Sequence, residues 1–438
     1  MASSDRPRID WDAATEEATD ILSRYIALNT SNPPGNEEEA ALFLRDILER
    51  EGIEVTIYEA APGRANLSAR LPGTGDGKPL VLLNHTDVVP AEAQFWQEEP
   101  FAGTVRDGVI WGRGALDMKG MAVMELMSLL LLRRHRVSPK RDVVFLAVAD
   151  EEAGGDVGID WLDHHHPELL EAEFVLNEGA YGFAELLGVR RPVFNCAVGE
   201  KGPLWVRLRT HGVPGHGSVP HEDNCLDRLI RVLYKVQGWR RPMTVVPELR
   251  TYFDRLYGKG FLPEQPTDSA LARTAETNPI VRALLTNTVS ITGVRGGIKH
   301  NVIPGVAEAT LDCRLLPGQD PDAFVEELRA VIDDDRVDLE LVLSSNTPSS
   351  AVQTRLFEVA EEVTREHVED ALVAPIISPG FTDSRVFRKR GVTAYGFIPI
   401  LLEPLEAATI HGHNERISID NLRLGTQILF EVTRRLCT

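Results

Sequence analysis

The chain has 438 residues, 43% of them hydrophobic and 26% charged, which is typical of a globular protein with enough apolar side chains for a large core. Its 46 basic and 66 acidic residues give a formal net charge of −20, which repels phosphate backbones and argues against nucleic-acid binding. The most apolar segment, 121–132, is interrupted by Glu125 and falls short of the ~20 residues that span a membrane, so we expect no membrane partner.

The N-terminus and the cysteines indicate the compartment. No long apolar stretch follows Met1, so we expect no signal peptide. The cysteines are far apart and lack paired spacing, so the sequence predicts neither a disulfide framework nor a thiolate metal site. We therefore expect a soluble, cytoplasmic protein with reduced cysteines at these positions: Cys196, Cys225, Cys313 and Cys437.

The first half of the chain predicts a layered α/β domain. Residues 12–51 predict two helices, the second with Asn36 as N-cap and Gly52 at its C-terminal end. From there to about 190, short apolar runs alternate with helical stretches, which favours a central mixed sheet with helices on both faces. The segment 119–135 is apolar around its whole circumference and predicts a buried helix that begins just after Asp117.

The pattern changes near residue 195 and predicts a second, inserted unit. Residues 196–209 alternate apolar with polar side chains, as a half-exposed strand does. Strands and two helices then indicate a small α+β unit. We therefore assign 1–195 and 346–438 to one domain and 196–345 to the insertion, within which we expect a helix at 222–238, strands at 289–292 and 306–315, a helix at 321–333 and a strand at 337–343.

Metal-preferring side chains stand at or just after apolar runs at five places. Because active sites of open α/β sheets lie beyond the carboxyl ends of the strands, we expect these residues to converge. A single such residue is usually a cap or a surface group, but five at strand ends favour a metal site. Imidazole and carboxylate suit zinc, with cobalt or manganese as alternatives. The candidates are His85, Asp117, Glu152, Glu178 and His411.

Two zinc ions need one carboxylate that bridges them, and we assign that role to Asp117. His85 and Glu178 would bind one ion, and Glu152 and His411 the other. No thiolate is needed in such a site. The sequence thus predicts a dinuclear centre.

Two further acidic residues predict how the site works. Asp87 stands two residues after His85 and would accept the free ring N–H, fixing the tautomer; the alternative is that it caps the following turn. In the pair Glu151-Glu152, adjacent side chains point in opposite directions. Glu152 then binds metal while Glu151 acts as general base. The alternative is that both residues cap the next helix.

These residues also carry a resemblance to a known family. The motifs are similar to those of the aminoacylase, glutamate carboxypeptidase and succinyl-diaminopimelate desuccinylase family of co-catalytic zinc hydrolases. Two more segments, 296–304 and 382–385, resemble the carboxypeptidase S and N-acyl-amino-acid hydrolase branch most closely. The shared motifs are His85-x-Asp87, Gly112-Arg113-Gly114-Ala115-x-Asp117, Glu151-Glu152-x-Gly154-Gly155, Glu178-Gly179, Gly215-His216-Gly217-Ser218 and His411-x-x-Asn414-Glu415.

The resemblance implies a zinc-peptidase-like catalytic domain with an inserted α+β ferredoxin-like lid and dimerisation domain, and hence a homodimer. It implies that His216, commonly supplied by a partner subunit, stabilises the oxyanion, with Asn301 binding nearby. Arg314 and Arg385 match positions that hold the substrate's carboxylate, and Gly380 lies where the backbone approaches it. Phe381 replaces the branch's asparagine, so the shape of the substrate pocket differs from the branch pattern.

The sequence therefore predicts a metal-dependent hydrolase that cleaves the amide bond of N-acyl amino acids or short peptides with a free carboxylate. A dipeptidase and an N-deacetylase or desuccinylase are alternatives within the same chemistry. A non-catalytic sensor that keeps the fold is the alternative from another class. The segment 239–285 matches no motif and predicts nothing about function.

Overall fold

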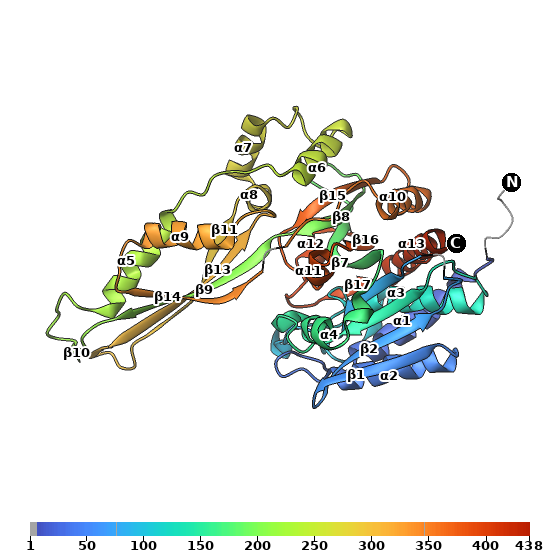
Figure 1. The fold of residues 1–438 in the computed structure, drawn as a ribbon, viewed down its shortest axis with the longest axis horizontal. Coiled ribbons are helices and arrows are strands. Elements are labelled where there is room, and N and C mark those ends of the chain that lie inside the picture. The colour runs from blue at the N-terminus through green and yellow to red at the C-terminus, as the bar shows by residue number, and fades with distance from the viewer. Residues whose placement is uncertain (1–6, 76, 346) are drawn as a thin grey trace.

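The larger part of the molecule is built on an eight-stranded sheet. The computed structural model describes residues 7–75, 77–345 and 347–438 (Figure 1). The strands run in the order β1-β2-β6-β3-β7-β16-β8-β15, with parallel pairs at the centre and antiparallel pairs beside them, so the sheet is mixed, as predicted. They are β1 (Glu54–Ala61), β2 (Arg64–Leu71), β3 (Leu80–His85), β6 (Val143–Val148), β7 (Phe174–Phe183), β8 (Val193–Glu200), β15 (Leu372–Ser378) and β16 (Thr393–Leu402).

Helices cover both faces of this sheet. Leu80 and Leu82 of β3 face one apolar cluster, and the alternate residues Val81 and Leu83 face another. The first cluster receives α1 (Trp11–Ile26), α2 (Glu37–Arg50), α3 (Lys119–Arg134), α10 (Arg355–His367) and α13 (Ile419–Cys437), and the second receives α4 (Ile159–His165) and α11 (Ser384–Lys389).

Helix α3 anchors the loop that precedes it. Its residues from Lys119 to Leu132 are all buried, which confirms the buried helix predicted there. Lys119 donates to the main-chain oxygens of Tyr25 (3.1 Å) and Leu28 (2.7 Å), which ties the start of α3 to the end of α1. Asp117, two residues before α3, therefore stands on a rigid base. Among the described residues, no helix is long and apolar enough to cross a membrane.

The smaller domain is a ferredoxin-like unit, as predicted. Its antiparallel strands run in the order β11-β13-β9-β14, and both helices pack on one face of the sheet. The chain order is β-α-β-β-α-β: β9 (Gly202–His211), α5 (Cys225–Gly238), β11 (Thr288–Gly296), β13 (Val306–Leu315), α9 (Pro321–Ile332) and β14 (Val337–Ser344). At its far tip, β10 (Gly215–His216) pairs with β12 (Val302–Ile303) (Figure 1).

Two segments assigned to the insertion pack in the larger domain instead. The strand β8 is buried along its whole length and pairs in parallel with β15, so the predicted half-exposed strand was wrong for residues 196–200. Residues 204–209 of β9 do alternate between buried and partly exposed side chains, as predicted. Its polar residue Glu200 lies inside because Arg388 pairs with it. The boundary expected at 195 therefore falls within a strand of the larger sheet.

Segment 239–285 forms three helices whose apolar side chains join the main core of the larger domain. These helices are α6 (Pro247–Gly258), α7 (Asp268–Thr277) and α8 (Pro279–Leu285). Asn36 precedes α2 as expected, but its side chain makes no capping bond, and the Glu37 carboxylate accepts the Asn36 N–H instead. Gly52 has the expected left-handed conformation, with φ +68°.

Short elements complete the larger domain. A three-stranded sheet of order β17-β5-β4 lies beside the loop that carries Asp117. The short elements are η1 (Ala93–Phe95), β4 (Val105–Arg106), β5 (Val109–Trp111), η2 (Glu151–Ala153), η3 (Pro167–Leu170), α12 (Pro404–Ala407) and β17 (Arg416–Ser418).

A close approach between two central strands gives the first testable prediction. A methyl group on Gly396 of β16 would stand 2.4 Å from the main-chain oxygen of Glu178 in β7. Because the backbone there cannot yield without moving the strand, Gly396→Ala should lower the free energy of unfolding by about 1–3 kcal/mol. Urea denaturation measures the change. Gly238→Ala is the control, since no atom lies within 4 Å of a methyl group there. Equal unfolding midpoints for the two variants would contradict the prediction.

Candidate metal centre

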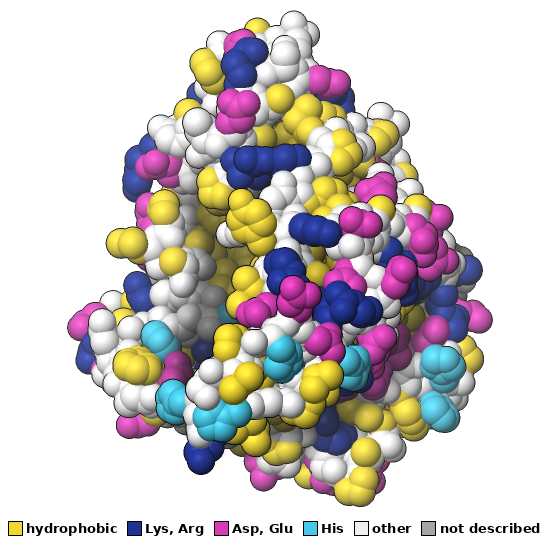
Figure 2. All heavy atoms as spheres, turned by 90° about the vertical axis from the view of Figure 1, so that its left-hand side faces the viewer, with side chains coloured by type: hydrophobic (Ala, Val, Ile, Leu, Met, Phe, Trp, Pro, Cys, Tyr) yellow, Lys and Arg dark blue, Asp and Glu magenta, His cyan; other side chains and the backbone are white. Residues whose placement is uncertain are grey.

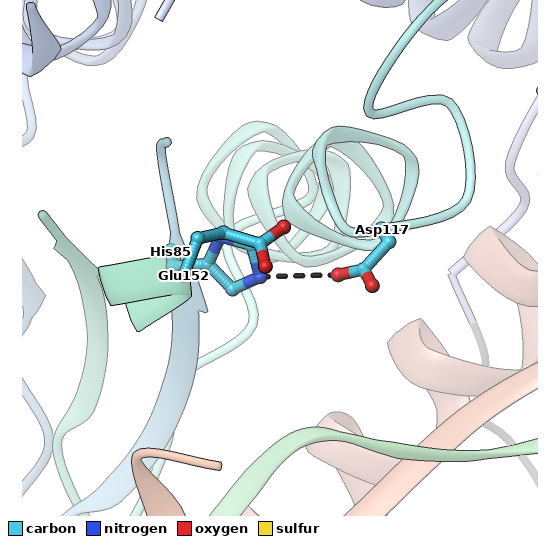
Figure 3. Close-up of side chains that lie close together, drawn as sticks. All are labelled: His85, Asp117 and Glu152. Carbon is cyan, nitrogen blue, oxygen red and sulfur yellow. Dashed lines mark hydrogen bonds and ion pairs between the residues drawn. The ribbon is translucent and has the colours of Figure 1, made fainter. Parts of the chain in front are cut away.

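The five predicted ligands lie together. His85 Nε2 is 3.2 Å from Asp117 Oδ1 and 3.5 Å from Glu178 Oε1. His411 Nε2 is 3.0 Å from Asp117 Oδ2 and 3.3 Å from Glu152 Oε2. Figure 3 shows His85, Asp117 and Glu152 converging from three separate segments. The two oxygens of Asp117 thus face two different imidazoles, which is the arrangement a bridging carboxylate needs.

Different elements present these side chains. His85 is the last residue of β3, Glu178 lies in the neighbouring β7, and Glu152 lies in η2, which follows β6. Asp117 precedes α3. The sequence places His411 after a strand, but the short helix α12 separates it from β16, and it has a left-handed conformation with φ +56°. The strand-end argument therefore holds for His85 and, shortly after β6, for Glu152. It was wrong in detail for Glu178, because β7 continues to Phe183, and for His411.

The electrostatics of the cluster call for a cation. Burial, and then the charge of Asp117, raise the pKa of Glu178 to about 7. Burial, and then the charge of Glu178, raise the pKa of Glu151 well above its usual range. Hydrogen bonds to Asp117 and Glu152 raise the pKa of His411 to about 10. The carboxylates repel one another in a low-dielectric setting, and a bound cation relieves that repulsion.

An orphaned atom supports the same conclusion. Glu152 Oε1 is buried and has no hydrogen-bond partner in the described part of the chain, although its other oxygen faces His411. Buried carboxylate oxygens are normally paired or bound to metal. His85 lies within 4.8 Å of two groups of potential ligands, one with Asp117 and Glu152 and the other with Glu151 and Glu178. This donor set of nitrogen and oxygen atoms fits zinc.

Asp87 joins the histidine to the turn that carries Glu151. The ring nitrogen His85 Nδ1 lies 3.0 Å from the main-chain oxygen of Asp87 and 3.4 Å from its carboxylate, so the nearer acceptor is the carbonyl. The Asp87 carboxylate accepts the N–H groups of Glu151 and Glu152, each at 3.2 Å. It also accepts Asn32 Nδ2 at 2.9 Å. Asp87 therefore orients the ring and the Glu151 turn together.

Glu415 holds the loop of Asp117, a role that the sequence does not reveal. Its carboxylate accepts the N–H groups of Leu116 (2.8 Å) and Asp117 (3.0 Å) through one oxygen. The other oxygen accepts Arg113 Nη1 at 2.6 Å and the Gly114 N–H at 3.1 Å. The motif around His411 includes Glu415, but only the fold shows that it reaches back nearly three hundred residues to this loop.

His216 and Asn301 lie together but away from the cluster. They belong to the β10–β12 tip, where the Gly217 N–H donates to the Asn301 main-chain oxygen at 2.8 Å. Figure 1 places β10 at the end of the smaller domain that is farthest from the large sheet. His216 is exposed, and its Nδ1 lies 2.8 Å from the Ser218 hydroxyl. Within a single chain, the structure does not bring these two residues to the predicted ligands.

Both arginines that the resemblance assigns to the substrate are paired within the chain. Arg385 donates to both oxygens of Asp160, at 2.9 and 2.6 Å. Arg314 donates to both oxygens of Asp312, at 2.8 and 3.2 Å, while its Nη1 is buried without a partner among the described residues. Gly380 is exposed in the loop between β15 and α11. Arg314 therefore keeps a buried donor, Nη1, without a partner among the described residues.

The fold and the cluster together define a metal-dependent peptidase or amidohydrolase. The chain belongs to Peptidase family M20/M25/M40, whose sequence profile it matches over residues 81–435. It is 29% identical to the human N-fatty-acyl-amino acid synthase/hydrolase PM20D1 over 82% of this chain and 74% of that protein. It is 28% identical to rat (Rattus norvegicus) aminoacylase-1B over 91% of this chain and 90% of that protein. The crystal structure of an M20 family metallo-carboxypeptidase, Sso-CP2 from Sulfolobus solfataricus, superposes with a TM-score of 0.73 at 21% identity, covering 96% of this chain and 98% of that one.

The Glu415 contacts give the second prediction. Glu415→Gln keeps the size of the side chain but replaces a charged acceptor with an amide that bears two N–H groups. The loop of Asp117 should then loosen, and metal affinity should fall about 10- to 100-fold. Titration of the metal-free protein with zinc measures the affinity. The control is Glu340→Gln, which removes an exposed ion pair with Arg207. Equal zinc affinity in the two variants would contradict the role of Glu415 in holding the Asp117 loop for metal binding.

Proposed function

We propose that the protein hydrolyses the amide bond of N-acyl amino acids that carry a free carboxylate, with two zinc ions held by the five clustered residues. The observation that carries this proposal is the Asp117 carboxylate, whose two oxygens each face a different histidine. Two relatives, the PM20D1 protein and aminoacylase-1B, are named for N-acyl amino acid chemistry. His85 and Glu178 would hold one ion, and Glu152 and His411 the other.

Metal ions bound there would polarise the scissile carbonyl and lower the pKa of water. Glu151 is the general base in this proposal. It lies on the same turn as Glu152 and within 4.8 Å of His85 and Glu178, so its carboxyl group opens onto the space between the ligands. Its raised pKa suits a group that accepts a proton from the attacking water and passes it to the leaving amine. Asp87 holds the main chain of Glu151 during this transfer.

The smaller domain would complete the site from a second copy of the chain. His216 would donate to the developing oxyanion, with Asn301 beside it. The β10–β12 tip that carries both residues lies far from the metal cluster of the same chain (Figure 1). A dimer formed through the smaller domain allows this tip to reach the partner's cluster. We therefore assign His216 to catalysis across the subunit interface.

The surface of the smaller domain supports such a dimer. Strand β11 stands at the edge of its sheet and exposes Ile291 and Val294. Helix α5, which contacts β11, exposes Ile230 (64%) and Tyr234 (77%). Figure 2, which views this side of the molecule, shows hydrophobic side chains on its surface. An unpaired edge beside exposed apolar side chains is typical of an interface.

The substrate's carboxylate would bind beside Gly380. Arg314 has one buried donor without a partner among the described residues, and Arg385 donates to the Gly154 main-chain oxygen at 2.8 Å. Phe381, which follows Gly380, lies against the Arg314 guanidinium. An assay of metal-reconstituted protein on N-acyl amino acids and on dipeptides would separate the aminoacylase assignment from the dipeptidase alternative.

We also infer a cytoplasmic location. The four cysteines of the chain are free and buried, which suits a reducing compartment. Fractionation of the source cells tests the location.

The third prediction concerns the general base. Glu151→Gln removes the proton acceptor but keeps the shape of the side chain, so it should lower kcat by about 10²- to 10⁴-fold. Elemental analysis should still find two metal ions per chain. Glu340→Gln, which changes an exposed acidic residue paired with Arg207 in the smaller domain, is the control and should keep full activity. Turnover of the Glu151 variant within a few fold of the parent protein would refute the assignment.

The fourth prediction separates catalysis within one chain from catalysis across the interface. His216→Ala and Glu151→Gln proteins should each be nearly inactive alone. After dissociation and mixing in equal amounts, half of the dimers carry one chain of each kind and therefore one intact shared site. Activity should return to about one quarter of the parent value for a two-fold symmetric dimer. A mixture that stays as inactive as its components, although mixed dimers form, would place His216 outside the partner's site.

A further inference from the structure

The junction between the two domains contains an adjacent pair of buried charged residues. Strand β8 of the large sheet ends at Glu200, and β9 of the smaller sheet begins at Gly202, so Glu200 and Lys201 occupy the crossing. Each residue is 1% exposed. Burying an ammonium and a carboxylate is costly unless both are hydrogen-bonded. The hydrogen-bond partners of Glu200 and Lys201 therefore show which segments this connection between the domains holds in place.

Lys201 joins this crossing to another one. Its ammonium donates to the main-chain oxygens of Ala283 (3.0 Å) and Thr286 (2.9 Å) and to the hydroxyl of Thr288 (3.0 Å). These acceptors lie where the chain leaves α8, which packs in the larger domain, and enters β11 of the smaller domain. An ammonium has three donors, and all three are used. Lys201 thus fastens two interdomain crossings to each other.

Glu200 faces the other way and holds a loop of the larger domain. One of its oxygens accepts the Thr382 N–H (3.1 Å) and the Thr382 hydroxyl (2.9 Å), and Arg388 pairs with it at 3.1 Å. Residues 379–383, between β15 and α11, form this loop. Its last residue, Asp383, lies against the turn of the proposed base: a methyl group on Gly155 would stand 3.4 Å from Asp383 Oδ1.

The same loop also contacts the smaller domain directly. The guanidinium of Arg314 lies 5.2 Å from the centre of the Phe381 ring. The Trp205 ring meets Phe381 edge to face, with ring centres 6.3 Å apart. Trp205 Nε1 donates to Asp312 Oδ1 at 3.1 Å, and Asp312 also binds Arg314. The loop is therefore held between the junction and the base of the smaller domain.

We propose that Glu200 and Lys201 are positioning residues that fix the orientation of the smaller domain relative to the 379–383 loop. Because adjacent side chains on an extended segment point in opposite directions, one residue holds the loop while the other holds the second crossing. The effect on turnover rests on the proposed function, in which the smaller domain supplies Arg314 and His216. Loss of these bonds lets the angle between the two domains vary but leaves the metal ligands in place.

The domain angle can be measured without any substrate. Spin labels on cysteines introduced at Glu49 of α2 and Glu326 of α9, both exposed, report the distance between the domains by pulsed electron resonance. The native cysteines are buried, so labelling should favour the new sites. Dilution with unlabelled protein suppresses distances between subunits. Lys201→Met removes the three donors, and Thr288→Val removes one acceptor from the opposite crossing while keeping the shape of the side chain.

We expect Lys201→Met to broaden the distance distribution, and Thr288→Val to broaden it less. Both variants should retain two metal ions per chain. The loss of alignment should lower kcat by about 10- to 100-fold in Lys201→Met and change KM less. The matched control is Lys235→Met, whose ammonium donates to Ile332 and Asp333 within the smaller domain, and it should resemble the parent protein.

Parent-like distance distributions in both junction variants would overturn the proposal. An unchanged distance distribution together with a loss of bound metal would also overturn it. That result would show that the junction positions the metal ligands and does not set the angle between the domains. If the parent protein hydrolyses none of the N-acyl amino acids or dipeptides, the proposed function fails. The distance measurement still decides the role of the junction.

Discussion

A single partly buried carboxylate, that of Asp117, is shared by two histidines that lie more than three hundred residues apart in the sequence. One of them ends the central strand β3, and the other lies between β16 and β17 near the end of the chain. The site therefore exists only when the first and last parts of the larger domain are packed together. Helix α3, which starts beside Asp117, packs against α13 at the end of the chain, and Glu415 ties the two parts at the site itself. Folding and site assembly are thus the same event.

The charges around the site are arranged in two groups. Carboxylates farther out are matched by arginines: Asp150 pairs with Arg64, and Asp160 pairs with Arg385. Glu415 likewise pairs with Arg113. The central carboxylates have only the two histidines as positive partners among the described residues. Since like charges in a buried setting raise one another's pKa, the centre is left with negative charge that the chain does not neutralise. Because the central carboxylates lack arginine partners among the described residues, a cation is favoured at the centre of the cluster.

Sequence patterns predicted ligands at or after apolar runs because an apolar run followed by an acidic residue or histidine is visible locally, although β7 continues past Glu178 to Phe183. His85, Glu152 and Glu178 could be found in this way, and the apolar run after Asp117 predicted the helix that anchors it. Glu415 and Asn32 could not be given roles, because their partners lie on distant segments and no periodicity marks them. The strand β8 was misjudged for a related reason. Its polar side chains suggest exposure, but they are buried with partners that only the fold supplies.

The smaller domain connects two places that the proposed function uses. At its base, Trp205 and Arg314 touch the Phe381 loop, and at its tip β10 carries His216 (Figure 1). A ferredoxin-like unit with its own packed core moves as one body. A small rotation at Glu200 and Lys201 therefore produces a larger displacement at the distant tip than at the base. In the proposed function His216 at that tip donates to the oxyanion, and a misplacement of about 1 Å is enough to lower the rate of such a step. In this proposal the junction is fastened by two buried side chains: Lys201 uses its three donors on the second crossing, and one oxygen of Glu200 holds the 379–383 loop.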